Sequence, residues 1–173
     1  MSGCPFPNPR RLVTGHDNKG NAIWLDDATH KPEPVHGRGD FGFSVLYRTE
    51  QFPADLSEPW QDPMKTPTTN LAVKDGVVFR VVDFPPKGPE IMHRTISLDF
   101  GIVMNGKISC ILDDGAIRDL NPGDRGTIHA WRNSSESWAR IYFVLTTAQP
   151  IKIDEKALPQ TGYKEEEMSS GGK

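Results

Sequence analysis

The sequence lacks several features that would point to a secreted or membrane protein. Its 173 residues hold only two cysteines, Cys4 and Cys110, which is too few for the disulfide framework of a small secreted domain. No stretch approaches the roughly 18 apolar residues of a membrane span, and residues 1–7 lack the apolar core of a signal peptide. We therefore expect a cytoplasmic protein with no membrane partner.

An excess of basic residues is also missing. Lysine and arginine number 20 against 23 aspartates and glutamates, for a net charge of -3, which argues against nucleic acid as a partner. The length favours one domain, and a hydrophobic content of 36% can fill one modest core. The 16 glycines and 15 prolines disfavour long helices, so a turn-rich β protein is expected.

Short β-like runs recur along the chain and predict its organisation. Residues 11–14 and 22–25 predict an N-terminal hairpin, and the proline-rich residues 52–70 predict a long surface loop or lid. The boundaries follow: a flexible tail over 1–10, one domain over 11–150 that includes the hairpin, and an extension with a disordered tail over 151–173. Further strands are expected at residues 41–47, 77–84, 101–104, 107–112, 116–120 and 138–145.

Turn signals separate these strands. Asn105-Gly106 is a strong hairpin signal, because both central residues of that turn need positive φ, and Asp113-Asp114-Gly115 predicts the next turn. Short strands at intervals of about 8 to 12 residues are typical of a β-sandwich or barrel.

A block with the order Gly88, His93, Thr95, Asp99 and Gly106 resembles the first motif of the cupins, G-x5-H-x-H-x3,4-E-x6-G. His93 fits the first histidine, Gly88 stands slightly close to it, and Gly106 falls at the right spacing. Thr95 replaces the second histidine and Asp99 replaces the glutamate.

A second block, Gly126, His129 and Asn133, matches the ending G-x2-H-x3-N of the second cupin motif in full. Together the blocks resemble small single-domain fungal cupins of the RmlC-like superfamily, and more narrowly the cupin-domain oxidoreductases of polyketide gene clusters. The likeness covers roughly residues 11–150. It implies an all-β, single-domain cupin fold, the double-stranded β-helix or jelly-roll barrel.

The resemblance also implies a metal site. Carried over by position, the ligands are His93, Asp99 and His129, and the candidate metals are Fe, Mn, Zn or Ni. Two histidines and a carboxylate resemble the facial triad that leaves open positions on iron(II). The alternative is a metal-free barrel in which His93 and His129 are buried, hydrogen-bonded histidines.

The first block has a spacing that places its polar residues on one side. His93, Thr95, Ser97 and Asp99 alternate with apolar or basic residues, and alternate residues of a strand share a face. A straight strand from His93 to Asp99 would span roughly 20 Å, too far for both side chains to reach one ion. We therefore expect the chain to bend between them.

The second block could bring His129 into the same cavity only if the chain before it is long enough. His129, Trp131 and Asn133 share a parity and could add a ligand, an aromatic wall and a polar contact to one cavity. In the family, however, about four residues of strand separate Pro-Gly-Asp from the Arg-Gly turn, whereas here Asp124 runs directly into Arg125. Removing them takes away ~13 Å of chain, which puts the usual position of His129 in doubt.

The resemblance implies an oxidoreductase or accessory tailoring enzyme that acts on a small polyketide-derived intermediate in fungal secondary-metabolite biosynthesis. The alternatives are a metal-independent dehydratase, cyclase or decarboxylase, and a non-catalytic binding protein. Expected partners are the small-molecule substrate, pathway dehydrogenases and a second copy of the chain in a homodimer. The residues assigned to catalysis are His93, Asp99 and His129, and those assigned to substrate binding are Thr95, Trp131 and Asn133.

Overall fold

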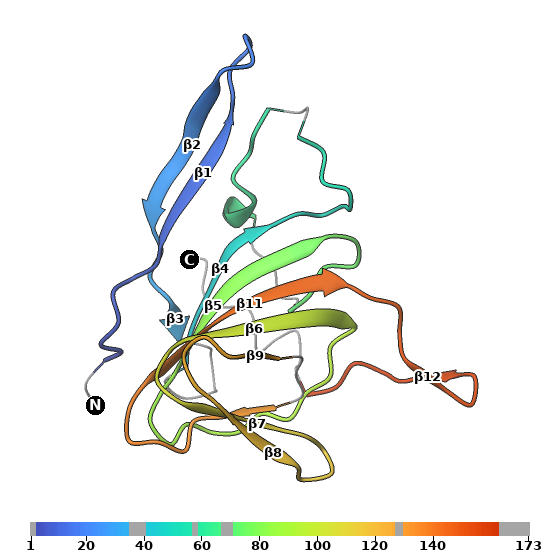
Figure 1. Cartoon of the computed structure of the whole chain (residues 1–173). Coiled ribbons are helices and arrows are strands. Elements are labelled where there is room, and N and C mark those ends of the chain that lie inside the picture. The colour runs from blue at the N-terminus through green and yellow to red at the C-terminus, as the bar shows by residue number, and fades with distance from the viewer. Residues whose placement is uncertain (1–2, 35–40, 57–58, 67–70, 127–129, 163–173) are drawn as a thin grey trace.

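Two sheets packed face to face form the body of the protein in the computed structural model, which describes residues 3–34, 41–56, 59–66, 71–126 and 130–162 (Figure 1). The larger sheet has six strands in the order β3 (Glu33–Pro34), β4 (Gly42–Arg48), β5 (Val77–Phe84), β11 (Ala139–Thr147), β6 (Ser97–Asn105) and β9 (Arg125–Gly126). The smaller has three, in the order β10 (Ala130–Arg132), β7 (Ile108–Ile111) and β8 (Ile117–Leu120). The all-β prediction is confirmed.

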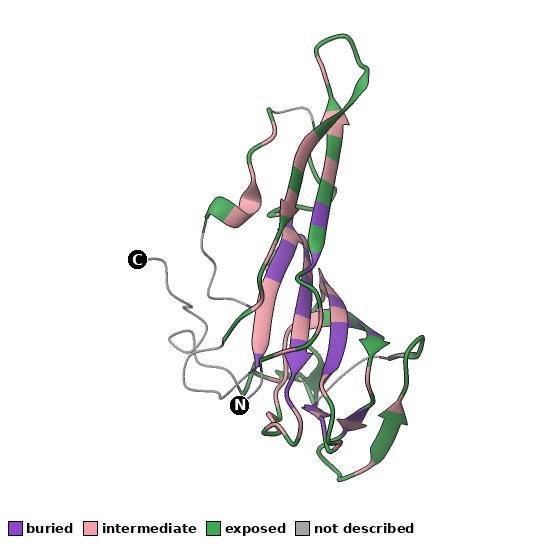
Figure 2. Ribbon diagram, turned by 90° about the vertical axis from the view of Figure 1, so that its left-hand side faces the viewer, coloured by how far each residue is buried: buried purple, intermediate pink, exposed green. Residues whose placement is uncertain are grey.

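The remaining elements lie outside these sheets. They are the hairpin of β1 (Arg10–His16) and β2 (Ala22–Thr29), the 3-10 turn η1 (Pro63–Lys65), and the short pair β12 (Lys152–Ile153) and β13 (Lys156–Ala157). In Figure 2 the buried residues follow the strands of the larger sheet, whereas the β1–β2 hairpin projects beyond it and is mostly exposed. None of the described residues forms a helix with the length and apolar content that a bilayer crossing takes.

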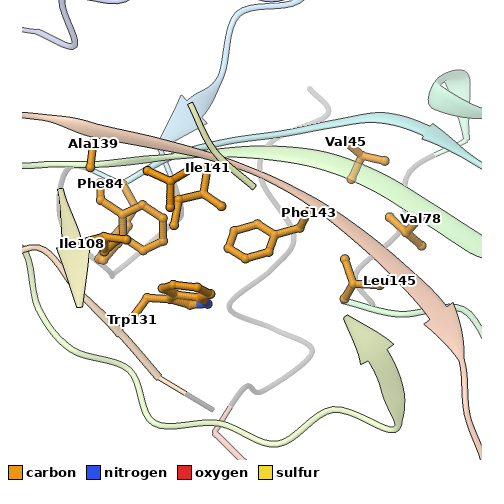
Figure 3. Close-up of a cluster of buried hydrophobic side chains, with 11 residues drawn as sticks. Val45, Val78, Phe84, Ile108, Trp131, Ala139, Ile141, Phe143 and Leu145 are labelled. Carbon is orange, nitrogen blue, oxygen red and sulfur yellow. The ribbon is translucent and has the colours of Figure 1, made fainter. Parts of the chain in front are cut away.

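The core fills the space between the two sheets (Figure 3). Alternate residues of β5 share a face, so Val78 and Phe84 lie together on its inner face, and β11 contributes Ile141, Phe143 and Leu145 in the same way. Because β5 and β11 pair antiparallel over eight residues, these inward side chains form one apolar layer. Its buried members include Val78, Phe84, Ile141, Phe143 and Leu145 from the larger sheet and Ile108 and Trp131 from the smaller.

The expected Asn105-Gly106 hairpin is wrong, although a turn does form there. Gly106 has φ +72, and a Cβ at this position would lie 2.4 Å from the Trp138 carbonyl oxygen. Asn105, however, does not adopt a positive φ, so the mirror-image turn of a tight hairpin is not formed. Both edges of β6 are taken by β11 and β9, and β7 pairs with β10 and β8. The turn is therefore a corner that carries the chain from one sheet to the other.

The next turn behaves as expected. Strands β7 and β8 pair antiparallel, and the turn between them is closed by a hydrogen bond from the Leu112 amide to the Ala116 carbonyl at 2.9 Å. Gly115 takes φ +84, which a residue with a side chain rarely adopts. The prediction of a turn at residues 113–115 is confirmed.

The N-terminal segment is anchored where a flexible tail was expected for residues 1–10. The Cys4 thiol donates to Asp83 Oδ2 at 3.3 Å, and Arg140 donates to the Pro7 carbonyl at 2.6 Å. The guanidinium of Arg140 also lies 5.2 Å from the centroid of the Phe6 ring. The described residues from Cys4 onward are therefore attached to the larger sheet through the Asp83–Arg140 pair.

The proline-rich loop is attached as well. The Asp62 carboxylate accepts from the Met64 amide at the start of η1 and from both terminal nitrogens of Arg11 on β1. Met64 packs against the core. The described part of this loop thus ties the N-terminal hairpin to the body, while residues 57–58 and 67–70 lie outside the described residues.

Candidate functional site

The segment that carries His93 is not part of a strand. Residues 89–96 contain one isolated bridge, between Arg94 and Thr161, and a bend at Ile96, after which β6 begins at Ser97. Reciprocal backbone hydrogen bonds of 3.1 and 3.0 Å join Arg94 and Thr161. The expected bend between His93 and Asp99 is therefore confirmed, and the C-terminal segment supports the loop that precedes β6.

Three polar side chains of the first block meet where β6 begins. Ser97 Oγ lies 2.5 Å from Asp99 Oδ1 and 2.8 Å from Thr95 Oγ1, and Thr95 Oγ1 donates to Asp99 Oδ2 at 3.3 Å. Asp99 is 9% exposed and faces inward, opposite Leu145 of β11. Each carboxylate oxygen thus has a hydroxyl partner, which fixes the orientation of the carboxylate. We call Thr95, Ser97 and Asp99 the hydroxyl–carboxylate cluster.

The His93 ring has a defined tautomer. Its Nδ1 lies 3.0 Å from the carbonyl oxygen of Ile91, and because a carbonyl can only accept, Nδ1 carries the proton. In the neutral ring the lone pair is then on Nε2, the nitrogen that can act as a base or a ligand. The backbone of Gly162 passes so close that a Cβ there would lie 2.5 Å from His93 Cβ. The loop backbone and the C-terminal segment together position this ring.

Trp131 lies inside the protein rather than at its rim. It is 5% exposed, and its ring meets Phe143 edge to face with centroids 5.6 Å apart (Figure 3). Gly101 of β6 makes room for it, since a Cβ on Gly101 would stand 3.1 Å from Trp131 Cζ2 and 3.0 Å from Phe143 Cε1. Trp131 is therefore an apolar wall of the interior, on the side opposite the larger sheet.

Asn133 is occupied by the backbone. Its Nδ2 donates to the carbonyls of Phe84 and Ser137, and its Oδ1 accepts from the amide and the hydroxyl of Ser135. The residue is 1% exposed. With both ends of the amide used, Asn133 shapes the turn between β10 and β11, and its role in substrate binding stays a prediction that this geometry does not favour.

His129 lies outside the described residues, with Thr127 and Ile128. The strands on either side of it are described, and they belong to different sheets: Gly126 pairs with Gly101 of β6, and Ala130 pairs with Ile111 of β7. The shortened connection after Asp124 runs beside β6, where Gly123 and Asp124 exchange backbone hydrogen bonds with Val103. The catalytic and metal roles of His129 stay predictions.

The described residues do not by themselves form a metal centre. Among them, no three histidine, cysteine, aspartate or glutamate side chains come together as a metal would need. The tautomer of His93 suits a ligand, whereas both oxygens of Asp99 already accept from hydroxyls.

Two interior residues were missed by the sequence reasoning. Arg80 on β5 and Arg48 on β4 are 2% and 6% exposed. Arg80 stands opposite Phe143 and Arg48 stands opposite Val78, both inward-facing core residues. The signal was available, because Arg80 shares the parity of the apolar residues Val78, Val82 and Phe84, which predicts that it faces the core.

A single β domain with two packed sheets and polar side chains turned into its interior is an architecture found among β-barrels and jelly rolls. Comparisons with known proteins agree. The chain is 39% identical over 163 residues to "Phomopsin biosynthesis cluster protein C'" of Diaporthe leptostromiformis, which covers 87% of this chain and 84% of the relative. It is 31% identical over 156 residues to "Cupin-domain-containing oxidoreductase fogC" of Aspergillus ruber, at 86% and 77% coverage. The chain belongs to the cupin-domain family that these fungal proteins represent, and the predicted resemblance is confirmed.

Solved structures give more distant similarities. A putative ethanolamine utilization protein from Salmonella typhimurium aligns with a TM-score of 0.48 and 12% identity, over 83% of this chain and 100% of that one. The cupin domain of Schizosaccharomyces pombe Cnp3 aligns with a TM-score of 0.46 and 11% identity, over 82% and 85%. No protein-family model matches the chain.

Proposed function

We propose that the protein is a cupin-type oxidoreductase or accessory tailoring enzyme that acts on a small intermediate of fungal secondary metabolism. The observation that carries the proposal is the hydroxyl–carboxylate cluster, an oriented and nearly buried carboxylate turned into the interior. Several relatives carry the name cupin-domain-containing oxidoreductase, which supports the reaction class. A polyketide-derived aromatic or aldehyde as substrate is part of the proposal.

In the proposed reaction, Asp99, His93 and Trp131 each have a separate role. Asp99, held by Ser97 and Thr95, accepts a proton or a hydrogen bond from the substrate at a fixed position. The Nε2 atom of His93 serves as a second base. Trp131 and its apolar surroundings exclude water from the bound molecule.

A divalent metal belongs to the proposal as a cofactor. His93, Asp99 and His129 would hold it, and when bound it would supply Lewis acidity or redox chemistry. Elemental analysis of the purified protein tests this directly. We expect about one equivalent of metal in the wild type and a clear loss in the His93→Ala and His129→Ala variants; equal content in all three proteins would contradict the assignment.

Acid–base chemistry without a metal is the second candidate. It is favoured by the same cluster, because a carboxylate with two hydroxyl partners and a histidine with a fixed tautomer can move protons unaided. A bell-shaped pH–rate profile that is unchanged by chelator would support it. Loss of activity on chelation, restored by adding metal back, would reject it.

Metabolite profiling of the source organism tests the proposed function. Strains carrying Asp99→Asn should lose a product and accumulate its precursor, because the variant lacks the carboxylate but keeps its size. Asp75→Asn is the matched control, since Asp75 is an exposed residue and should leave the profile unchanged. An unchanged profile in the Asp99→Asn strain would contradict a catalytic role, and failure of the purified wild-type protein to turn over the accumulated precursor would favour a non-catalytic binding protein.

A further inference from the structure

The inner face of the larger sheet carries two buried guanidinium groups. Arg80 in the middle of β5 is 2% exposed and stands opposite Val45 of β4 and Phe143 of β11. Arg48 at the end of β4 is 6% exposed and stands opposite Val78 of β5. Both therefore point to the side of the sheet on which Val45, Val78 and Phe143 form the core.

The two arginines are close enough to act on one group. Since Arg80 is opposite Val45 and Arg48 is opposite Val78, they occupy diagonal positions on adjacent strands, where such pairs lie about 7–8 Å apart. The Arg80 guanidinium lies 5.0 Å from the centroid of the Phe43 ring. Two like charges at this spacing on a buried face raise the local potential, and an anion between them would lower their energy.

Two other buried arginines, Arg140 and Arg11, show what a guanidinium paired with carboxylates of the chain looks like. Arg140 forms a bidentate pair with Asp83 at 2.6 and 2.7 Å, and Arg11 is bonded to two carboxylates, those of Asp26 and Asp62. In both cases the fork of the guanidinium meets carboxylates of the chain itself. Such pairs are complete without a ligand.

Arg48 has no such buried carboxylate partner among the described residues. Its Nε donates to Glu50 at 2.7 Å, but the Glu50 side chain is 68% exposed. Its Nη1 is buried and has no hydrogen-bond partner in the part of the chain that the structure describes. A buried guanidinium nitrogen without an acceptor is costly, so an acceptor from outside the chain would be bound strongly.

We propose that Arg48 and Arg80 bind the carboxylate of an organic acid and that the substrate of the enzyme is therefore an acid. The forked guanidinium fits a carboxylate, and the neighbouring Phe143 and Leu145 suit the hydrocarbon body of such a molecule. The inference rests on the proposed function only for calling the bound acid a substrate.

The register also sets where the rest of the acid lies. One row of paired residues crosses the sheet from Arg48 through Val78 and Leu145 to Asp99. Three strand spacings of about 4.8 Å separate its ends, roughly 14 Å between backbones. An acid held by the arginines thus directs its far end toward the hydroxyl–carboxylate cluster, which separates the anchored group from the reacting group.

Isothermal titration with two matched probes tests the acid site. Benzoate and benzamide have nearly the same shape, but only benzoate is an anion. We expect benzoate to bind the wild-type protein at least about 10-fold more tightly than benzamide, and Arg48→Gln and Arg80→Gln to weaken benzoate by about 10- to 100-fold. Arg118→Gln, which removes a charge from the exposed strand β8, should leave the affinity unchanged. No benzoate binding, equal binding of the two probes, or undiminished binding by both inner variants would overturn the proposal.

Two further variants distinguish a loss of acid binding from a loss of folding and from a loss of the proposed reaction. Arg48→Met should melt at or above the wild-type temperature, because it removes an incompletely paired buried charge, and should lose the rise in melting temperature that benzoate gives the wild type. A large fall in its ligand-free melting temperature would mean that Arg48 is already compensated and would overturn the proposal. Asp99→Asn should bind benzoate as well as the wild type does, even though the proposed function predicts that its reaction is lost, so the two proposals fail separately.

Discussion

The two faces of the six-stranded sheet carry buried charge in different ways. On the outer face, Asp83 of β5 and Arg140 of β11 form a closed pair, which raises the pKa of the Arg140 guanidinium and anchors the N-terminal segment. On the inner face, and within the part of the chain that the structure describes, Asp99 is bonded to two hydroxyls and Arg48 to one exposed carboxylate. The outer pair ties elements of the fold together, whereas the inner groups are the ones that the proposed ligand site uses.

Strand β6 shows the same contrast within nine residues. Its inward positions are polar at the start, Ser97 and Asp99, and apolar further on, where Val103 belongs to the core. Its outward positions include the exposed apolar side chains Leu98, Phe100, Ile102 and Met104. A strand that faces water on one side usually has polar residues on that side, so both the inward polar residues and the outward apolar ones depart from the usual pattern.

The largest fall in the free energy of unfolding is expected when the buried Asp83–Arg140 pair of the outer face is broken. Asp83→Asn leaves Arg140 buried without its anion, which should lower the free energy of unfolding by about 3–5 kcal/mol, as measured by chemical denaturation. Asp27→Asn, which breaks the exposed pair with Arg10, is the control and should leave the unfolding midpoint unchanged. If the two variants were equally stable, the Asp83–Arg140 pair would not stabilise the fold more than an exposed ion pair does.

The second-largest fall in the free energy of unfolding is expected when the packing between the two sheets is disturbed. Gly101→Ala places a methyl group 3.0–3.1 Å from the Phe143 and Trp131 rings, which must move, so we expect a loss of about 1–3 kcal/mol and a changed near-ultraviolet circular dichroism signal. Gly3→Ala is the control, because a Cβ there meets nothing within 4 Å. A wild-type midpoint for Gly101→Ala would show that Trp131 is not held against β6.

The ion pair between the hairpin and the loop should have a smaller, pH-dependent effect. Hydrogen bonds from Arg11 lower the pKa of the Asp62 carboxyl, so its stabilisation is present above about pH 4 and is lost as the pH falls through the folded-state pKa. Asp62→Asn should cost about 1 kcal/mol at pH 7, with the difference from wild type shrinking below about pH 4. A difference that is constant from pH 7 to pH 3 would contradict this.

The inner carboxylate should matter least for folding. An amide at position 99 can accept from one of the two hydroxyls through its oxygen and donate to the oxygen of the other through its nitrogen, so Asp99→Asn should change the free energy of unfolding by less than about 1 kcal/mol. Thermal melts of the purified variant measure this. A loss as large as that of Asp83→Asn would make Asp99 a structural residue and remove the contrast between the two faces.

Much of the fold follows from local pattern. Runs of β-forming residues predict β5 and the β1–β2 hairpin, and turn residues predict the turn at 113–115, because each depends on neighbours in sequence. The bend before Asp99 could be predicted because a straight strand would keep the two ligands implied by the cupin resemblance roughly 20 Å apart. The inward direction of the cluster follows from parity once the fold is known.

The errors arise where tertiary pairing decides. Asn105-Gly106 has the composition of a hairpin turn, but the edges of β6 are already occupied by β11 and β9, so the chain turns into the other sheet. For Asn133 the substrate-binding role stays a prediction, but the hydrogen bonds of its amide to the Phe84 and Ser137 carbonyls could not be foreseen, because only the fold brings these groups near. Contacts between distant segments leave no periodic signal in the sequence.

The bridge between Arg94 and Thr161 has a practical consequence for anyone who handles this protein. Shortening the gene to the end of β11 would remove the chain that supports the His93 loop, and it would also remove Gly162, whose backbone lies against that histidine. A trimmed version would keep its two sheets but lose the segment that positions the His93 ring. Assays should therefore use the untrimmed polypeptide, with any purification tag joined by a cleavable linker.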